Sequence, residues 1–204
     1  RAILAAAGTG GHINPAIRIA NKIMEEEPDS EILFIGTYKG LENDLVPRAG
    51  YNLKQIEAYG LALKPTITNI TNFFRTISSI KDVKEIIEEF KPDIVIGTGG
   101  YICAPVFKVA TDLKIPTLLH EANAYPGKVI KLFNKKADKI LLGFDKAKEH
   151  FKYKENLITV GNPSNMKRNQ FTKEEKTDIF KKLELDESLP VLLINGGSQG
   201  ARTI

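Results

Sequence analysis

Glycine-rich turns and one histidine are the residues of this sequence best suited to chemistry. Gly8-Thr9-Gly10-Gly11-His12 follows the small apolar segment Leu4–Ala7 and precedes an amphipathic run. Glycines at the end of a strand let backbone N–H groups approach a ligand without a Cβ in the way. The start of a helix adds positive charge at the same point. This turn therefore predicts an anion-binding site.

The glycine pattern returns twice further along the chain. Gly97-Thr98-Gly99-Gly100 follows Ile94-Val95-Ile96, and Gly196-Gly197-Ser198-Gln199-Gly200 follows the apolar run 191–194. A single glycine turn can simply permit a tight strand-to-helix connection. Three of them at three expected strand ends, two of them identical, favour a ligand rich in phosphate.

Several common phosphate sites are disfavoured. A dinucleotide fingerprint needs a third glycine, where this chain has Ile13 and Ile102, and an acidic residue after the second strand, which here ends in Gly36-Thr37-Tyr38. No turn carries the Gly-Lys-Ser/Thr of a P-loop. The sequence has no Asp-x-Asp pair and no His/Cys cluster with metal-ligand spacing. We therefore expect no metal and no cofactor, with a diphosphate neutralised by helix dipoles and backbone amides.

The bulk composition sets broad limits. A chain of 204 residues holds one large domain, or one domain plus part of another. The net charge of +4 favours phosphate-bearing partners or an anionic membrane surface, and is too weak to predict nucleic-acid binding. The single cysteine, Cys103, excludes a disulfide framework, fits a reducing compartment and reads as a small core residue. No apolar run approaches the roughly 20 residues that span a bilayer, and no signal peptide opens the chain.

Strand and helix patterns alternate with short connections. This order predicts an α/β fold, with a doubly wound parallel sheet and helices on both faces. The expected strands are 4–7, 31–36, 51–57, 94–96, 117–120, 139–142, 157–160 and 191–194. The expected helices are 15–27, 41–49, 69–90, 104–113, 126–136 and 173–183. Thr172 with Glu175 predicts a capping box before the last of these helices.

Five motifs in order carry a family resemblance. They are Gly8–His12, Gly97–Tyr101, His120-Glu121-Ala122-Asn123, Gly161-Asn162-Pro163 and Gly196–Ala201. Together they closely resemble the MurG family, the peripheral glycosyltransferases of bacterial peptidoglycan synthesis, over the whole chain. The resemblance implies a GT-B fold and inverting, metal-independent transfer of N-acetylglucosamine from UDP-GlcNAc. The acceptor would be the C4 hydroxyl of the muramoyl sugar in lipid I, giving lipid II at the cytoplasmic face of the bacterial cell membrane.

The same resemblance divides the chain. Residues 1–163 would be the Rossmann-like domain that holds the acceptor and faces the membrane. Residues 164–204 would be a linker helix and the first strand and turn of the UDP-sugar-binding domain, so the sequence looks cut from a longer protein. We expect the fragment alone to be inactive.

His12 is the candidate catalytic base. Inverting transfer needs a group that takes the proton of the attacking hydroxyl, and the positive end of a helix favours a neutral imidazole that can do so. The family resemblance points to the same histidine. The structural alternative is a turn histidine that bonds the backbone. His120 is more simply structural than a second base, and His150 is more simply a solvated residue.

The resemblance also assigns the binding residues. Donor contacts are expected from Thr9, Gly10, Gly11, Asn123, Asn165 and Ser198. The acceptor diphosphate is expected at Gly10, Gly11, Gly99, Gly100 and Tyr101. Supporting roles are expected of Glu121, Gln199 and Gly200, with structural bracing an equally good role for Glu121. The family often has an arginine where this chain has Asn165, so the charge is lost there, and Arg168 compensates only if its loop folds back.

A membrane patch is expected at the helix that starts near Asn69. It comprises Ile70, Phe73, Phe74 and Ile77, with Lys64 and Arg75 close by. An apolar stripe at helical spacing is most simply a core face. However, Phe73 and Phe74 are adjacent and cannot both point at one centre, and a basic rim suits anionic lipid.

Two other classes of function remain open. One is a different GT-B enzyme, either a lipid glycosyltransferase or a UDP-sugar epimerase, and an epimerase needs no lipid acceptor. The other is a non-catalytic module that binds the acceptor or the membrane.

Overall fold

The computed structural model describes residues 1–59, 67–164 and 171–194. The chain forms two compact units, Arg1–Ser164 and Asn165–Ile204, and each is described by itself.

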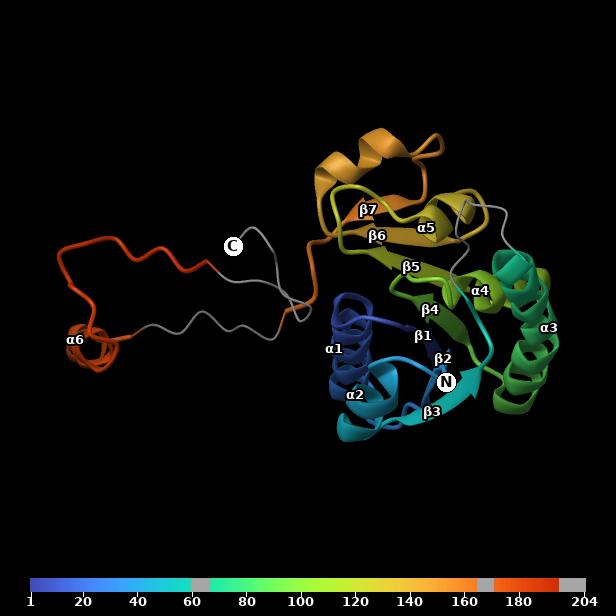
Figure 1. Ribbon diagram of the computed structural model, residues 1–204, viewed down its shortest axis with the longest axis horizontal. Helices are drawn as coiled ribbons and strands as arrows, with labels where there is room; N and C mark the ends of the chain where they lie inside the picture. Colours follow the sequence, from blue (N-terminus) through green and yellow to red (C-terminus); the bar gives the residue numbers. More distant parts are fainter. Residues whose placement is uncertain (60–66, 165–170, 195–204) are drawn as a thin grey trace. The chain divides into compact units, whose positions relative to one another are not determined.

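The first unit is built on a seven-stranded parallel sheet (Figure 1). Its strands are β1 Ala2–Ala5, β2 Ile32–Thr37, β3 Asn52–Ile56, β4 Ile94–Gly97, β5 Thr117–Glu121, β6 Lys139–Leu142 and β7 Leu157–Thr159. They lie in the order β3-β2-β1-β4-β5-β6-β7, and every neighbouring pair is parallel. From β1 the chain adds β2 and β3 on one side of the sheet, and it then returns to add β4, β5, β6 and β7 on the other side, as in a doubly wound sheet. The predicted fold class is confirmed.

The two faces of the sheet carry separate hydrophobic cores. In β1, Ala2 and Leu4 belong to one core, and Ile3 and Ala5 belong to the other, because side chains alternate along a strand. Helices α1 (Gly10–Glu26) and α2 (Glu42–Arg48) cover the first face. Helices α3 (Ile67–Phe90), α4 (Cys103–Asp112) and α5 (Lys128–Leu132) cover the second face (Figure 1). Burial on both faces explains why the central strands are almost wholly apolar.

Most predicted elements of the first unit are confirmed to within a few residues, with three differences. Helix α1 begins at Gly10, not at Pro15, so the last two glycines of the first turn and His12 lie in its first turn. Helix α5 ends at Leu132, well before residue 136, and Asn134 instead bonds the backbone N–H and carbonyl of Tyr153. A short 3-10 helix, η1 (Asp145–His150), was not predicted.

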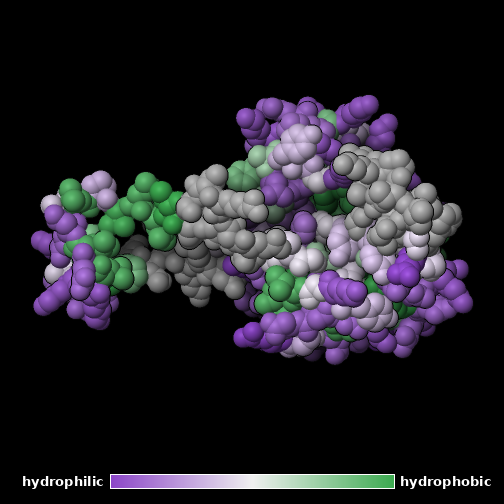
Figure 2. All heavy atoms as spheres, in the orientation of Figure 1, coloured by the Kyte–Doolittle hydropathy of each residue, from purple (hydrophilic) through white to green (hydrophobic). Residues whose placement is uncertain are grey.

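The second unit contains one described helix, α6 (Lys173–Lys182). Its predicted capping box is confirmed, since the Thr172 hydroxyl accepts from the Glu175 N–H and the Glu175 carboxylate accepts from the Thr172 N–H. The prediction of a strand at 191–194 is wrong. These four residues are exposed and form no ladder, because the described part of this unit holds no strand to pair with them. Figure 2 shows green, hydrophobic surface on this unit, whose exposed large apolar side chains include Leu183, Leu189 and the four residues 191–194.

We predict that Phe107→Ala costs about 3–5 kcal/mol of unfolding free energy. Phe107 is fully buried on α4, and its ring packs edge-on against Phe133 with centroids 5.8 Å apart. Leu113→Ala, at an exposed position just after the same helix, should change the free energy by less than about 0.5 kcal/mol. Urea denaturation measures both, and similar losses would contradict the assigned core.

Candidate functional site

The site lies where the strand order reverses. Strands β1 and β4 are neighbours, and the two glycine turns follow their carboxyl ends. The first turn leads into α1 on one face of the sheet, and the second leads into α4 on the other face. In open α/β sheets this divergence leaves a crevice at the carboxyl edge, where ligands bind.

The two turns are in direct contact. The Thr98 hydroxyl donates to the backbone carbonyl of His12 at 2.7 Å. The His12 ring lies against the second turn so closely that a Cβ on Gly99 would sit 2.9 Å from its Cδ2 atom. A Cβ on Gly100 would sit 3.4 Å from its Nδ1 atom. Since both glycines also have positive φ, of 102° and 82°, only glycine fits beneath this imidazole.

The start of α1 presents backbone donors. Thr9 is the N-cap residue and its side chain makes no capping bond, while Gly10 and Gly11 are the first two helical residues. The first N–H groups of a helix have no partner within it. No acidic residue occupies this first turn, so nothing on the helix itself competes for an anion there.

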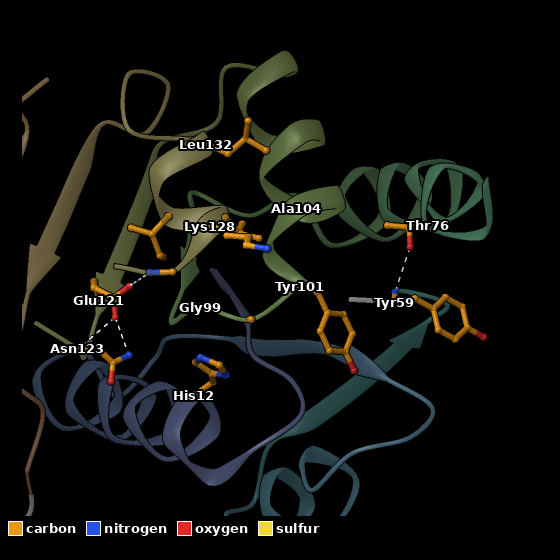
Figure 3. Close-up of a pocket in the computed structure, with 14 residues that line it drawn as sticks. His12, Tyr59, Thr76, Gly99, Tyr101, Ala104, Glu121, Asn123, Lys128 and Leu132 are labelled. Carbon is orange, nitrogen blue, oxygen red and sulfur yellow. Dashed lines mark hydrogen bonds between the residues drawn. The ribbon is translucent and has the colours of Figure 1, made fainter. Parts of the chain in front are cut away.

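A cavity of about 410 Å³ opens beside the two turns (Figure 3). His12, Glu121, Asn123 and Lys128 are among its polar lining residues. Much of its remaining wall is apolar and belongs to α4 and α5, with Ala104, Val129 and Leu132 among the contributors. The cavity therefore joins a set of glycine amides to an apolar wall with one lysine beside it. The other lining residues are Tyr59, Thr76, Gly99, Gly100, Tyr101, Gly127 and Ile130.

Glu121 braces one wall of the cavity. One carboxylate oxygen accepts from the Asn123 backbone N–H at 2.8 Å and from its side-chain amide at 2.9 Å. The other accepts from the N–H of Gly127, the N-cap of α5, at 2.7 Å (Figure 3). Because both oxygens are engaged within the loop, Glu121 fixes where Asn123 and α5 lie.

His120 is buried beneath the site rather than lining it. Its side chain is 1% exposed, and Nε2 lies 3.2 Å from the carbonyl oxygen of Gly161. Its Nδ1 atom has no hydrogen-bond partner among the described residues. Burial lowers the pKa of His120, although the Gly161 carbonyl and the Glu121 carboxylate oppose that shift. The structural role expected for this histidine agrees with its position.

The lowered pKa of His120 predicts a pH-dependent stability. Below about pH 6.5 the unfolded chain binds a proton that the buried ring does not, so unfolding free energy falls as pH falls. One such proton contributes a slope of at most about 1.4 kcal/mol per pH unit. In His120→Gln this component should vanish, because the amide can still donate to Gly161 but does not titrate.

Urea denaturation of both proteins between about pH 5 and pH 7.5 measures the difference. The two proteins differ only at residue 120, so the pH dependence that the rest of the chain contributes is common to both. Equal slopes in the two proteins would contradict the assignment.

The structure brings six of the predicted site residues together around the cavity. They are His12, Gly99, Gly100, Tyr101, Glu121 and Asn123. Thr9, Gly10 and Gly11 lie at the adjoining start of α1 and do not line the cavity. Asn165, Ser198, Gln199 and Gly200 lie outside the described residues.

Sequence reasoning missed several lining residues. Tyr59 and Thr76 are joined by a 3.1 Å hydrogen bond from the Tyr59 N–H to the Thr76 hydroxyl. No local sequence pattern predicts this contact. Lys128 also lines the cavity, and it belongs to none of the motifs. Gly127 offered a usable signal, since it stands between a strand end and a helix start.

The predicted membrane patch is only partly described. Lys64 lies outside the described residues, and so do the side chains of Ile70, Phe73 and Phe74. Ile77 is 44% exposed, and the Arg75 guanidinium lies 5.9 Å from the centre of the Tyr59 ring.

Other exposed apolar side chains lie on and before α5. Leu132 is 68% exposed and Tyr125 is 69% exposed, with the Lys131 ammonium 3.9 Å from the centre of the Tyr125 ring. Within the ranges that the structure describes, no helix is long and apolar enough to cross a membrane.

Cys103 supports the second turn from below. It is fully buried, and its thiol donates to the Gly99 carbonyl at 3.2 Å. Burial raises the pKa of the thiol to about 12, so the reactive thiolate is scarce at neutral pH. Among the residues described, no group of three or more His, Cys, Asp and Glu side chains is placed to hold a metal ion.

Comparison with known proteins identifies relatives of the whole chain. The model of the glycosyltransferase family 28 N-terminal domain matches residues 2–142. The chain is 43% identical over 204 residues to the UDP-N-acetylglucosamine--N-acetylmuramyl-(pentapeptide) pyrophosphoryl-undecaprenol N-acetylglucosamine transferase of Alkaliphilus oremlandii, covering 100% of this chain and 55% of that protein. The transferase of the same name from Acetivibrio thermocellus is 40% identical, with 100% and 54% covered. The chain thus spans about half the length of these curated relatives.

Solved structures agree on the fold. The crystal structure of MurG from Acinetobacter baumannii matches with a TM-score of 0.68 and 24% identity, over 83% of this chain and 49% of that one. A Methanocaldococcus jannaschii UDP-GlcNAc 2-epimerase, solved in complex with UDP-GlcNAc and UDP, matches with a TM-score of 0.58 and 16% identity, over 79% and 46%. At these identities the likeness is one of fold alone.

Proposed function

The chain belongs to glycosyltransferase family 28, and from this membership we propose that it forms the acceptor-binding half of a lipid I N-acetylglucosamine transferase. The full-length protein would move N-acetylglucosamine from UDP-GlcNAc to the C4 hydroxyl of the muramoyl sugar of lipid I, with inversion and without a metal ion. Lipid II is the product. Residues 1–204 alone would not catalyse this transfer, because most of the UDP-GlcNAc site would belong to the other half of the full-length protein.

The contact between the two glycine turns is the observation that carries this proposal. Two runs of Gly-Thr-Gly-Gly, separated by about half of the first unit, meet at one point with His12 packed on Gly99 and Gly100. A purely structural pair of strand-to-helix connections does not require an imidazole between them. An acceptor that carries a diphosphate and must also lose a hydroxyl proton needs a base beside its anion-binding turns, and an imidazole there can be that base.

Backbone amides can hold the diphosphate of the acceptor. The N–H groups at the start of α1, from Gly10 and Gly11, belong to one turn, and the bend of Gly99, Gly100 and Tyr101 belongs to the other. Helix starts and consecutive backbone amides both bind phosphate. Lys128 at the rim of the cavity adds a positive charge, and the apolar wall of α4 and α5 suits the lipid end of the acceptor.

His12 is proposed as the general base. As the acceptor C4 oxygen attacks the anomeric carbon of the donor, its proton passes to the His12 imidazole. The bond from the anomeric carbon to the β-phosphate oxygen breaks in the same step, and its electron pair leaves on UDP. The attack comes from the face opposite the leaving group and therefore inverts the anomeric centre. Thr9, Gly10, Gly11, Asn123, Asn165 and Ser198 stay proposed donor contacts.

We predict that His12→Ala lowers kcat at least about a hundredfold in the full-length protein, because a general base typically supplies that much. His150→Ala is the matched control, since His150 is exposed on η1 and lies outside the cavity lining. Release of UDP in the presence of UDP-GlcNAc and lipid I measures the rate. Near-normal turnover in His12→Ala would remove His12 from the mechanism.

The same assay separates the alternative enzyme. The likeness to a UDP-GlcNAc 2-epimerase is the observation that keeps it open. An epimerase would convert UDP-GlcNAc without lipid I, whereas the proposed transferase releases UDP only when lipid I is present. A different lipid acceptor would appear as turnover with that lipid and none with lipid I.

The membrane surface is proposed as a further partner. Lipid I is membrane-anchored, so the acceptor-binding half would dock peripherally on the cytoplasmic face, through the predicted patch on α3. Exposed Ile77 and Arg75 on that helix support the proposal, and so do Leu132 and Lys131 on α5.

We predict that Ile77→Asp weakens binding to vesicles containing phosphatidylglycerol at least about tenfold, because burying an isoleucine side chain is worth about 1.5–3 kcal/mol. Ser78→Asp adds the same charge at the next exposed position of α3 and should weaken binding less. Vesicle sedimentation at low salt measures both. Equal loss in the two variants, or no binding by the unmodified protein, would count against docking through this face.

A further inference from the structure

We propose that Glu42 is a positioning residue that holds the first glycine turn in place for catalysis, an inference that rests on the proposed function. Glu42 is the first residue of α2 and is 0% exposed. It does not line the cavity, so it acts on the site only through the turn it touches.

The Glu42 carboxylate joins two segments at the carboxyl edge of the sheet. Its Oε2 atom accepts from the Gly8 N–H at 2.9 Å, at the beginning of the first turn. Its Oε1 atom accepts from the Thr37 N–H at 2.9 Å and from the Thr37 hydroxyl at 2.7 Å, at the end of β2. A weaker backbone bond from Leu41 N–H to the Gly8 carbonyl, at 3.4 Å, runs beside them.

The surrounding chain leaves room for this side chain. A Cβ on Gly36 would sit 2.7 Å from the Glu42 Cγ atom, and a Cβ on Gly40 would collide with the carboxylate itself. Neither glycine has a positive φ, so their backbone conformations do not call for glycine. The two glycines are explained by the space that Glu42 occupies.

Only a carboxylate satisfies these donors. Two backbone N–H groups, from Gly8 and Thr37, point at two different oxygens of one side chain. A glutamine in the same place has one acceptor oxygen, and its NH₂ group would face one of the two N–H groups. A buried donor without an acceptor is costly, so the turn or the strand end would move.

The moving part would be the Gly8 turn. Thr37 is held in the ladder of β2 with β3, whereas Gly8 lies beyond the end of β1 with a φ of 92°. His12 follows four residues later and packs on the second turn. Misplacement by about 1 Å can cost a hundredfold in rate, so the chemistry of His12 depends on where Gly8 is held.

Glu42→Gln in the full-length protein tests the inference, with Thr37→Val as the matched control. Thr37→Val removes the hydroxyl that donates to the same carboxylate and leaves both backbone contacts in place. We expect Glu42→Gln to lower kcat at least about tenfold. Thr37→Val should keep kcat within about threefold of the unmodified protein.

Amide hydrogen exchange gives a readout that is independent of activity. The Gly8 N–H should exchange at least about tenfold faster in Glu42→Gln and at an unchanged rate in Thr37→Val. Unchanged kcat and unchanged Gly8 exchange in Glu42→Gln would overturn the inference. Equal effects of the two variants on both readouts would also overturn it, because Glu42 would then be only a packing residue.

If Glu42→Gln does not fold, a second variant tests the same inference. Gly8→Ala places a side chain at a positive φ and shifts the same end of the turn that Glu42 holds, so it should reproduce the loss of kcat. Full activity in Gly8→Ala would overturn the inference. If the unmodified protein does not transfer to lipid I, the proposed function fails, and the exchange of Gly8 alone then decides the role of Glu42.

Discussion

The packing of an imidazole onto a bare glycine backbone is the constraint on which the rest of the site depends. His12 can lie over Gly99 and Gly100 only because neither has a Cβ and both adopt positive φ. The contact joins the end of β1 to the end of β4, two neighbouring strands far apart in sequence. It also makes the two turns mutually dependent, since a shift of either one changes the surroundings of the imidazole.

The sheet supplies the rigidity that this contact needs. The residues of β1 are all buried, with small and branched side chains dividing between two cores, so the strand is clamped by helices on both faces. A site that binds charge with backbone amides must have its donors in place beforehand, because they cannot be reoriented cheaply when the ligand arrives. Two buried side chains hold the turns in place. The Glu42 carboxylate accepts from the Gly8 N–H of the first turn, and the Cys103 thiol donates to the Gly99 carbonyl of the second.

The fold could be predicted from the sequence because its signals are local and repeated. Apolar strands ending in glycine and followed by amphipathic runs predict parallel strands with crossover helices, and the structure has them. The start of α1 was misjudged because proline favours the first turn of a helix, whereas Pro15 here lies further inside. The segment 191–194 was misjudged because its pattern is that of a strand, and strand formation also requires a partner.

The candidate site could be predicted only where its residues belong to motifs. The glycine turns and His12 stand out in the sequence, while Tyr59, Thr76 and Leu132 reach the cavity through tertiary packing alone. Glu42 shows the limit most clearly. An acidic residue at the start of a helix is ordinarily a solvated complement to the helix dipole. It is buried because two glycines leave room for it and the chain after two strands supplies its hydrogen-bond donors. These segments lie apart in the sequence, so no local pattern predicts the burial.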